Sequence, residues 1–156
     1  MIPGDRLLCV LVENKAVGFE FKDWLLHVTI VPWFRLDSES ADITKDLKVK
    51  LNSIKPFAVT MGRENVQFGH QKDKIATLVQ LPTTLTDIEQ TVRSYLRSRE
   101  SWIVDETTKH PRAFKPHITN QKNSSMHEGD IFTCDRLLMI EQKGGLKEIV
   151  GEVNLG

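Results

Sequence analysis

Two short stretches of the chain, residues 26–30 (LHVTI) and 114–119 (FKPHIT), each carry the pattern His-x-Thr. Both are rich in β-branched residues and are typical of short β-strands. Successive side chains of a strand point to opposite faces, so His27 would share a face with Thr29, and His117 with Thr119. Two such strands facing one another would bring two imidazoles and two hydroxyls into one site.

Such a set suits acid–base chemistry on a phosphate ester. An unperturbed imidazole titrates near neutrality, so one histidine can accept a proton from the attacking group while the other protonates the leaving oxygen. The hydroxyls can donate hydrogen bonds to phosphate oxygens as charge develops. We therefore expect His27 and His117 to be catalytic and Thr29 and Thr119 to bind phosphate. This chemistry requires no metal, and we expect no cofactor.

Two other interpretations of the histidines stay open. A single His-x-Thr occurs by chance in many chains, and a lone histidine on a strand is more often structural than catalytic. His110, His117 and His127 could instead bind a metal, although their spacing matches no compact zinc pattern and no cysteine or carboxylate cluster completes the set.

The segment 107–127 around the second motif contains no acidic residue but four Lys or Arg residues and three of the five histidines. This composition suits an anionic ligand, and it is equally typical of a solvated loop. Among the aromatic residues near the motifs, Phe114 is the candidate for stacking on a nucleobase. For the others, Trp24, Trp33 and Phe34, packing in or around the core is the simpler interpretation.

The remaining composition sets broad limits. A chain of 156 residues, 40% hydrophobic and 27% charged, fits one domain spanning residues 1–156. Cys9 and Cys134 lie too far apart in sequence to suggest a disulfide framework, so we expect a cytoplasmic location and buried thiols. The apolar run 7–12 is too short to cross a membrane, and no signal-peptide pattern precedes it.

The periodicity of the chain predicts an α+β fold in which two helices cover mostly antiparallel strands. Asp37 or Ser38 would cap the first helix, which ends before Pro56, and a capping box at 86–89 would open the second. The His-x-Thr strand recurs 90 positions later, with a helix between strands in each half, which predicts two related lobes around a central cleft. Strands are expected at 6–13, 24–33, 57–61, 74–81, 117–119, 131–141 and 146–155, the last two forming a hairpin around Gly144.

The two motifs, residues 26–30 and 114–119, resemble the signature tetrapeptides of the 2H phosphoesterase superfamily, and the order of elements resembles that family over most of the chain. The family includes 2'-5' RNA ligase-like proteins and cyclic nucleotide phosphodiesterases. The resemblance implies a bilobal, pseudo-twofold α+β fold and metal-independent chemistry on 2',3'-cyclic phosphates or 2'-5' phosphodiesters. It assigns catalysis to His27 and His117 and phosphate binding to Thr29 and Thr119. It also implies nucleotide-binding roles for Arg112, Phe114 and Lys122.

Asn120 departs from the family pattern, which has an apolar residue after each motif, and residues 31–33 replace a basic residue of the RNA ligase-like members. We expect a monomer that opens the 2',3'-cyclic phosphate of a nucleotide or RNA end, with His117 as the base and a 2'-phosphate product. The alternatives are a 2'-5' RNA ligase or phosphodiesterase acting on tRNA or an oligoadenylate, a non-catalytic nucleotide-binding module, and a scaffold protein with two incidental motifs.

Overall fold

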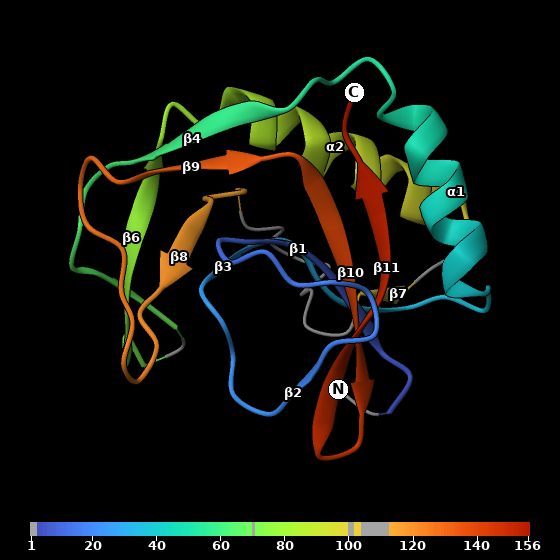
Figure 1. Cartoon of the computed structure of the whole chain (residues 1–156), viewed down its shortest axis with the longest axis horizontal. Coiled ribbons are helices and arrows are strands. Elements are labelled where there is room, and N and C mark those ends of the chain that lie inside the picture. Colours follow the sequence, from blue (N-terminus) through green and yellow to red (C-terminus); the bar gives the residue numbers. More distant parts are fainter. Residues whose placement is uncertain (1–2, 70, 100–101, 104–112) are drawn as a thin grey trace.

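The computed structural model describes residues 3–69, 71–99, 102–103 and 113–156, which form a curled antiparallel sheet with two helices (Figure 1). The elements in chain order are β1 (Arg6–Leu11), β2 (Glu20–Phe21), β3 (His27–Arg35), α1 (Ser40–Lys50), β4 (Phe57–Met61), β5 (Val66–Phe68), β6 (Lys74–Gln80), α2 (Thr83–Ser98), β7 (Trp102–Ile103), β8 (His117–Thr119), β9 (Ile131–Cys134), β10 (Arg136–Lys143) and β11 (Leu146–Asn154).

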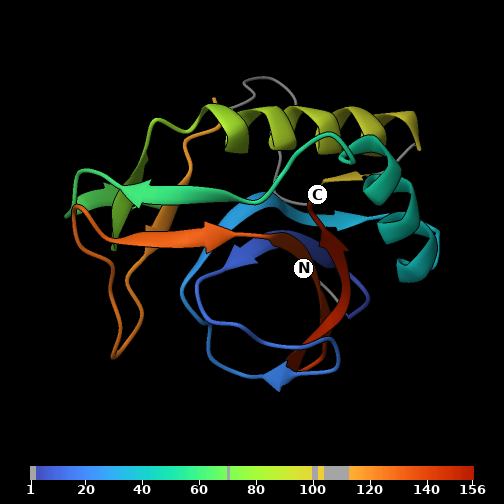
Figure 2. The same cartoon turned by 45° about the horizontal axis from the view of Figure 1, so that its top comes forward.

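The sheet places the two motif strands side by side at its centre. Its strand order is β2-β11-β10-β1-β3-β8-β6-β4-β9, with β5 paired to β6 and β7 paired to β3. Helix α1 packs against β11 and α2 against β3, so both helices lie over one side of the curled sheet (Figure 2). The expected α+β class, with antiparallel strands and flanking helices, is confirmed.

Two apolar clusters fill the two faces of the sheet. The larger one lies beneath the helices and includes Val28 and Ile118, the middle residues of the two motifs, which are both 0% exposed. The smaller one contains Cys9 and Trp33 and lies on the opposite face of β1 and β3. Because neighbours along a strand face opposite ways, burial of the middle residues turns the histidines and threonines away from the larger core.

The N-cap of helix α1 lies two residues after Asp37, the earliest expected cap. It is Glu39, which makes no side-chain capping bond, rather than Asp37 or Ser38, so the capping prediction is wrong. The helix is held by its buried face, with Ile43 and Leu47 in the main core.

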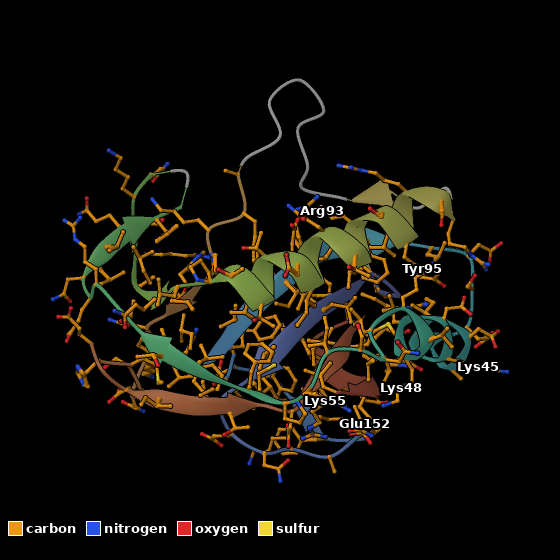
Figure 3. The ribbon with its side chains drawn as sticks, turned by 90° about the horizontal axis from the view of Figure 1, so that it is seen from above. Lys45, Lys48, Lys55, Arg93, Tyr95 and Glu152 are labelled. Atoms are coloured by element: carbon orange, nitrogen blue, oxygen red, sulfur yellow. The ribbon has the colours of Figure 1, made fainter. Side chains whose placement is uncertain are left out.

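Helix α2 begins at Thr83, directly after Pro82, so the predicted capping box at 86–89 is also wrong. Glu89 lies inside the helix and accepts a hydrogen bond from Arg93 instead. The expected buried face is confirmed, and it includes Tyr95, whose hydroxyl donates to Asp46 Oδ2 at 2.7 Å and joins α2 to α1 (Figure 3).

The strand predicted at 131–141 is broken at Asp135. Residues before the break form β9, which pairs with β4 at one end of the strand order, and residues after it form β10, which pairs with β1 and β11. The chain therefore changes partners at this corner, while Cys134 before it and Leu137 two residues after it both stay in the main core. Apolar periodicity alone does not reveal such a change of partner.

Strand β3 continues past Pro32 to Arg35, although proline was expected to close it. The pairing of β1 with β3 shifts register between Leu8 and Arg6, opposite Val31 and Phe34, and Pro32 lies in that irregular part. A bulge tolerates proline because no ladder hydrogen bond from its nitrogen is required. Strand β1 ends at Leu11, two residues earlier than expected.

Within the described residues, neither helix is long and apolar enough to cross a membrane. Cys9 and Cys134 are free and buried, as expected. Burial raises the pKa of the Cys134 thiol to about 12 and that of Cys9 well above its usual range. Both thiols therefore behave as small apolar core groups.

Candidate active site

The site is built on a single cross-strand contact between β3 and β8. Val28 pairs with Ile118 in an antiparallel register, which places His27 opposite Thr119 and Thr29 opposite His117. All four side chains lie on the face opposite the main core, and the two histidines are diagonal neighbours. Diagonal partners in an antiparallel pair are about 7–8 Å apart, which leaves room for a phosphate between the rings.

Each imidazole is held in the same way by its own backbone. His27 Nδ1 lies 2.7 Å from the carbonyl oxygen of Leu25, and His117 Nδ1 lies 2.7 Å from that of Lys115. A carbonyl oxygen only accepts hydrogen bonds, so Nδ1 carries the proton in both rings. Nε2 is then the atom of each neutral imidazole that can exchange a proton with a substrate.

An aromatic ring also covers one face of each imidazole. Trp24 stacks on His27 with 4.2 Å between ring centroids and 28° between planes. Phe68 stacks on His117 with 3.8 Å and 14°. The sequence suggested only packing for Trp24. It did not single out Phe68, which lies on the three-residue strand β5, between the strands expected at 57–61 and 74–81.

Both imidazoles are in surroundings that disfavour their charged form. Burial lowers the pKa of His27, and the charges of His117 and Lys74 lower it further, whereas the hydrogen bond to Leu25 raises it. Burial also lowers the pKa of His117, and the charges of Lys115 and Lys74 lower it further, whereas the hydrogen bond to the Lys115 backbone raises it. Both rings are therefore predominantly neutral at pH 7.

Lys74 is a further cationic group of this face that the sequence did not reveal. Strand β6 pairs with β8 so that Ala76 is opposite Thr119, and Lys74, two residues before Ala76, lies on the same face. It is also directly opposite Phe68 on β5. Among the described residues neither Lys74 nor the two threonine hydroxyls has a hydrogen-bond or ion-pair partner, so all three are available to an anion.

The other residues singled out from the sequence lie in different surroundings. Arg112 and His110 lie outside the described residues. Phe114 is partly buried and packs against the main core, and Lys122 is exposed in the turn closed by the Gln121–Ser124 bridge. His127 is exposed with Nδ1 3.3 Å from Glu64 Oε2. Within the described part of the chain, no three His, Cys, Asp or Glu side chains gather closely enough to hold a metal ion.

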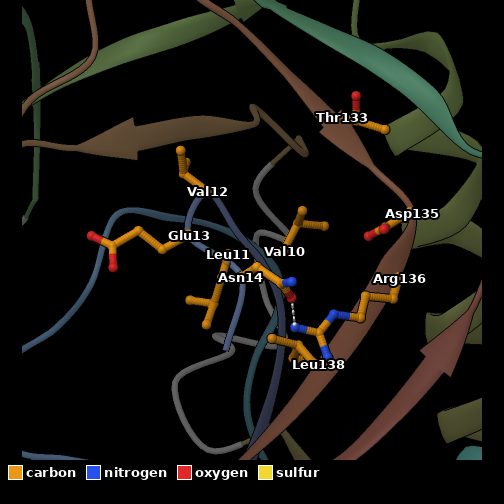
Figure 4. Close-up of a pocket in the computed structure, with 9 residues that line it drawn as sticks. All are labelled: Val10, Leu11, Val12, Glu13, Asn14, Thr133, Asp135, Arg136 and Leu138. Atoms are coloured by element: carbon orange, nitrogen blue, oxygen red, sulfur yellow. Dashed lines mark hydrogen bonds between the residues drawn. The ribbon is translucent and has the colours of Figure 1, made fainter. Parts of the chain in front are cut away.

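A cavity of about 160 Å³ opens elsewhere, where the end of β1 separates from the β9–β10 corner (Figure 4). Arg136 lies along its wall and donates to Glu152 at 2.6 Å, to Asn14 Oδ1 at 2.7 Å and to the carbonyl of Lys15. Its guanidinium therefore joins the N-terminal segment to β10 and β11. None of the four motif residues lines this cavity.

Comparison with known proteins identifies the family of the chain and solved structures with a similar fold. The sequence model of the 2'-5' RNA ligase superfamily matches residues 15–143, which include both motifs. None of the curated protein sequences matches the chain. Similar solved structures include Escherichia coli LigT complexed with 3'-AMP (TM-score 0.61, 15% identity), LigT complexed with NADP+ (0.61, 14%) and a phosphoesterase (0.60, 14%), each aligned over 99% of both chains. The chain belongs to the 2'-5' RNA ligase superfamily of 2H phosphoesterases.

Proposed function

We propose that this protein is a metal-independent phosphoesterase that opens the 2',3'-cyclic phosphate of a nucleotide or of an RNA end. The observation that carries the proposal is the Val28–Ile118 pairing, which puts two imidazoles with the same Nδ1 anchor on one face beside two unpartnered hydroxyls. The structures of LigT with 3'-AMP and NADP+ support a nucleotide as the ligand class.

In the proposed reaction His117 Nε2 takes a proton from water as the water oxygen attacks phosphorus. The bond from phosphorus to the ribose 3' oxygen breaks, and protonated His27 gives its Nε2 proton to that oxygen, which leaves a 2'-phosphate. Thr29 and Thr119 donate to the non-bridging oxygens, where negative charge accumulates. Proton exchange with solvent then restores neutral His117 and protonated His27.

The proposal includes outer parts of the site. Arg112, Phe114 and Lys122 are proposed to contact the nucleotide beyond the phosphate. Because both histidines and both threonines come from one chain, a monomer is sufficient for the reaction. The two free, buried thiols are consistent with the cytoplasm as the proposed location.

The test is hydrolysis of nucleoside 2',3'-cyclic phosphates in the presence of a chelator by the wild type and by His27→Ala and His117→Ala. Removing a general acid or base lowers rates by about 10²–10⁴-fold, so both variants should lose activity on that scale. His127→Ala is the matched control, because His127 is exposed and lies against Glu64. Wild-type rates in either motif variant would contradict the mechanism.

The family itself supports a second candidate, a 2'-5' RNA ligase in which a ribose 5'-hydroxyl replaces water as the attacking group. Supplying an RNA with a 5'-hydroxyl end together with a 2',3'-cyclic phosphate end distinguishes the two. A joined product that depends on both histidines favours the ligase. Tight nucleotide binding with neither hydrolysis nor joining favours a binding module.

A further inference from the structure

We propose that Trp24 and Phe68 are positioning residues that hold the imidazoles of His27 and His117 with Nε2 directed at the phosphate. This inference rests on the proposed function and extends it, because neither aromatic residue belongs to a His-x-Thr motif.

The geometry shows why a second contact is needed. The covalent bond to Cβ and the hydrogen bond from Nδ1 to a backbone carbonyl hold one edge of each ring, and the ring can still pivot about that edge. A flat partner at 4.2 Å for His27 and 3.8 Å for His117 restricts that pivot. The bond and the stacked ring together therefore determine where Nε2 points.

The same arrangement arises from unrelated parts of the chain. Trp24 lies three residues before His27, in the connection that leads into β3, whereas Phe68 reaches His117 from β5, across β6. Each half of the sheet thus supplies one aromatic ring to one histidine by a different route. A shared function explains this convergence better than incidental packing does.

Both rings are themselves held in place. Trp24 is partly buried and packs against the smaller apolar cluster, 5.4 Å from Phe21 and 6.2 Å from Trp33, ring centroid to ring centroid. Phe68 is fixed by its pairing opposite Lys74. The turn after Phe68 contains Gly69 at a φ of +98°, a backbone conformation that favours glycine over residues with a side chain.

The rings of Trp24 and Phe68 suit the proposed roles of His27 as acid and His117 as base. Tryptophan is the best aromatic partner for a cation, so Trp24 favours the protonated state that His27 needs as the acid. Phenylalanine attracts a cation less strongly, which suits His117 as the neutral base. Burial lowers the pKa of both rings, and at His27 the hydrogen bond to the Leu25 carbonyl opposes this effect.

The activity test uses Phe68→Leu, which keeps the apolar volume and removes the flat ring. A misplaced base slows the chemical step more than it weakens binding, so we expect kcat to fall about tenfold with KM changed by less than about twofold. Phe68→Tyr should restore the wild-type rate. Phe19→Leu is the matched control, because this partly buried ring stacks on Phe21 at 6.1 Å rather than on a histidine.

The second readout does not depend on turnover. Imidazole ¹⁵N spectra report which nitrogen carries the proton, and we expect Phe68→Leu to weaken the Nδ1–H form at His117 and leave His27 unchanged. Trp24→Leu should do the reverse, and Trp24→Phe, the variant closer to the native packing, should preserve both rings.

Wild-type kcat in Phe68→Leu, or unchanged His117 spectra in the folded variant, would overturn the positioning role. Absence of turnover by the wild type on every cyclic phosphate would contradict the proposed function instead, and the spectra would still decide whether the aromatic rings position the imidazoles.

Discussion

The two imidazoles share surroundings that favour loss of their protons, and this sets the pH at which the site can work. The proposed reaction needs one neutral and one protonated histidine. Because the pKa of each ring lies below its ordinary value of 6.5, the singly protonated pair declines as pH rises past that value. We therefore predict a bell-shaped profile of kcat/KM with its maximum below pH 6.5, measured over the range of about pH 4 to 9.

A matched pair of variants tests the cause of that profile. The charge of Lys74 lowers the pKa of both histidines, so Lys74→Met should move the maximum to higher pH. Lys72→Met removes the same charge from the same hairpin, at a residue that affects neither histidine's pKa, and should leave the maximum in place. A maximum above pH 7 in the wild type would contradict the assignment of both rings as neutral groups.

The contact between α1 and β11 gives a prediction at the scale of the elements. A Cβ added to Gly151 would lie 2.8 Å from Thr44 Cγ2, so the helix and strand can approach this closely only because the strand has glycine there. We expect Gly151→Ala to lower the free energy of unfolding by about 1–3 kcal/mol, measured by urea denaturation.

Two further variants distinguish steric conflict from a general effect of alanine in place of glycine. Thr44→Ser removes the Cγ2 methyl but keeps the hydroxyl that donates to Ser40 and Ala41, so it should rescue much of the loss in Gly151→Ala. Gly145→Ala has open space at its Cβ position and should be near neutral. Equal losses at Gly145 and Gly151 would mean that the steric explanation is wrong.

Elements with a strong local pattern could be predicted from the sequence, and elements defined by a partner could not. Alternation or helical spacing over five or more residues correctly located β4, β6 and the buried face of α2. Strands β2, β5 and β7 have only two or three residues, so they are defined by pairing with β11, β6 and β3 and have no pattern of their own. Phe68 was missed for the same reason.

At the scale of the whole molecule, the proposed site depends on sheet topology more than on local structure. The face shared by His27, Thr29, His117 and Thr119 follows from alternation within two short strands, and it could be predicted. Their direct pairing, with Val28 opposite Ile118, joins segments 90 positions apart and comes from the order of the whole sheet. The change of partner at Asp135, which places β9 and β10 in opposite halves of that order, left no signal in the sequence.

Because the paired strands β3 and β8 lie at the centre of the sheet, the charge state of their histidines should affect the stability of the whole fold. Burial makes each folded-state pKa lower than its unfolded value of 6.5, so the unfolded chain binds more protons just below that pH. The contribution of the two neutral histidines to the free energy of unfolding is therefore fully present above pH 6.5. It is lost as pH falls toward the folded-state pKa, because the unfolded chain then gains protons that the folded chain does not bind. We therefore predict that the urea midpoint decreases as pH is lowered from 6.5, and that this decrease is smaller in the double variant His27→Ala/His117→Ala.

The carboxylate of Glu64 has its pKa lowered chiefly by the hydrogen bond from the Glu128 amide, so its contribution to stability is lost only below pH 4.5 and does not overlap with that of the histidines. An equal decrease in the double variant between pH 6.5 and 4.5 would show that other groups are responsible.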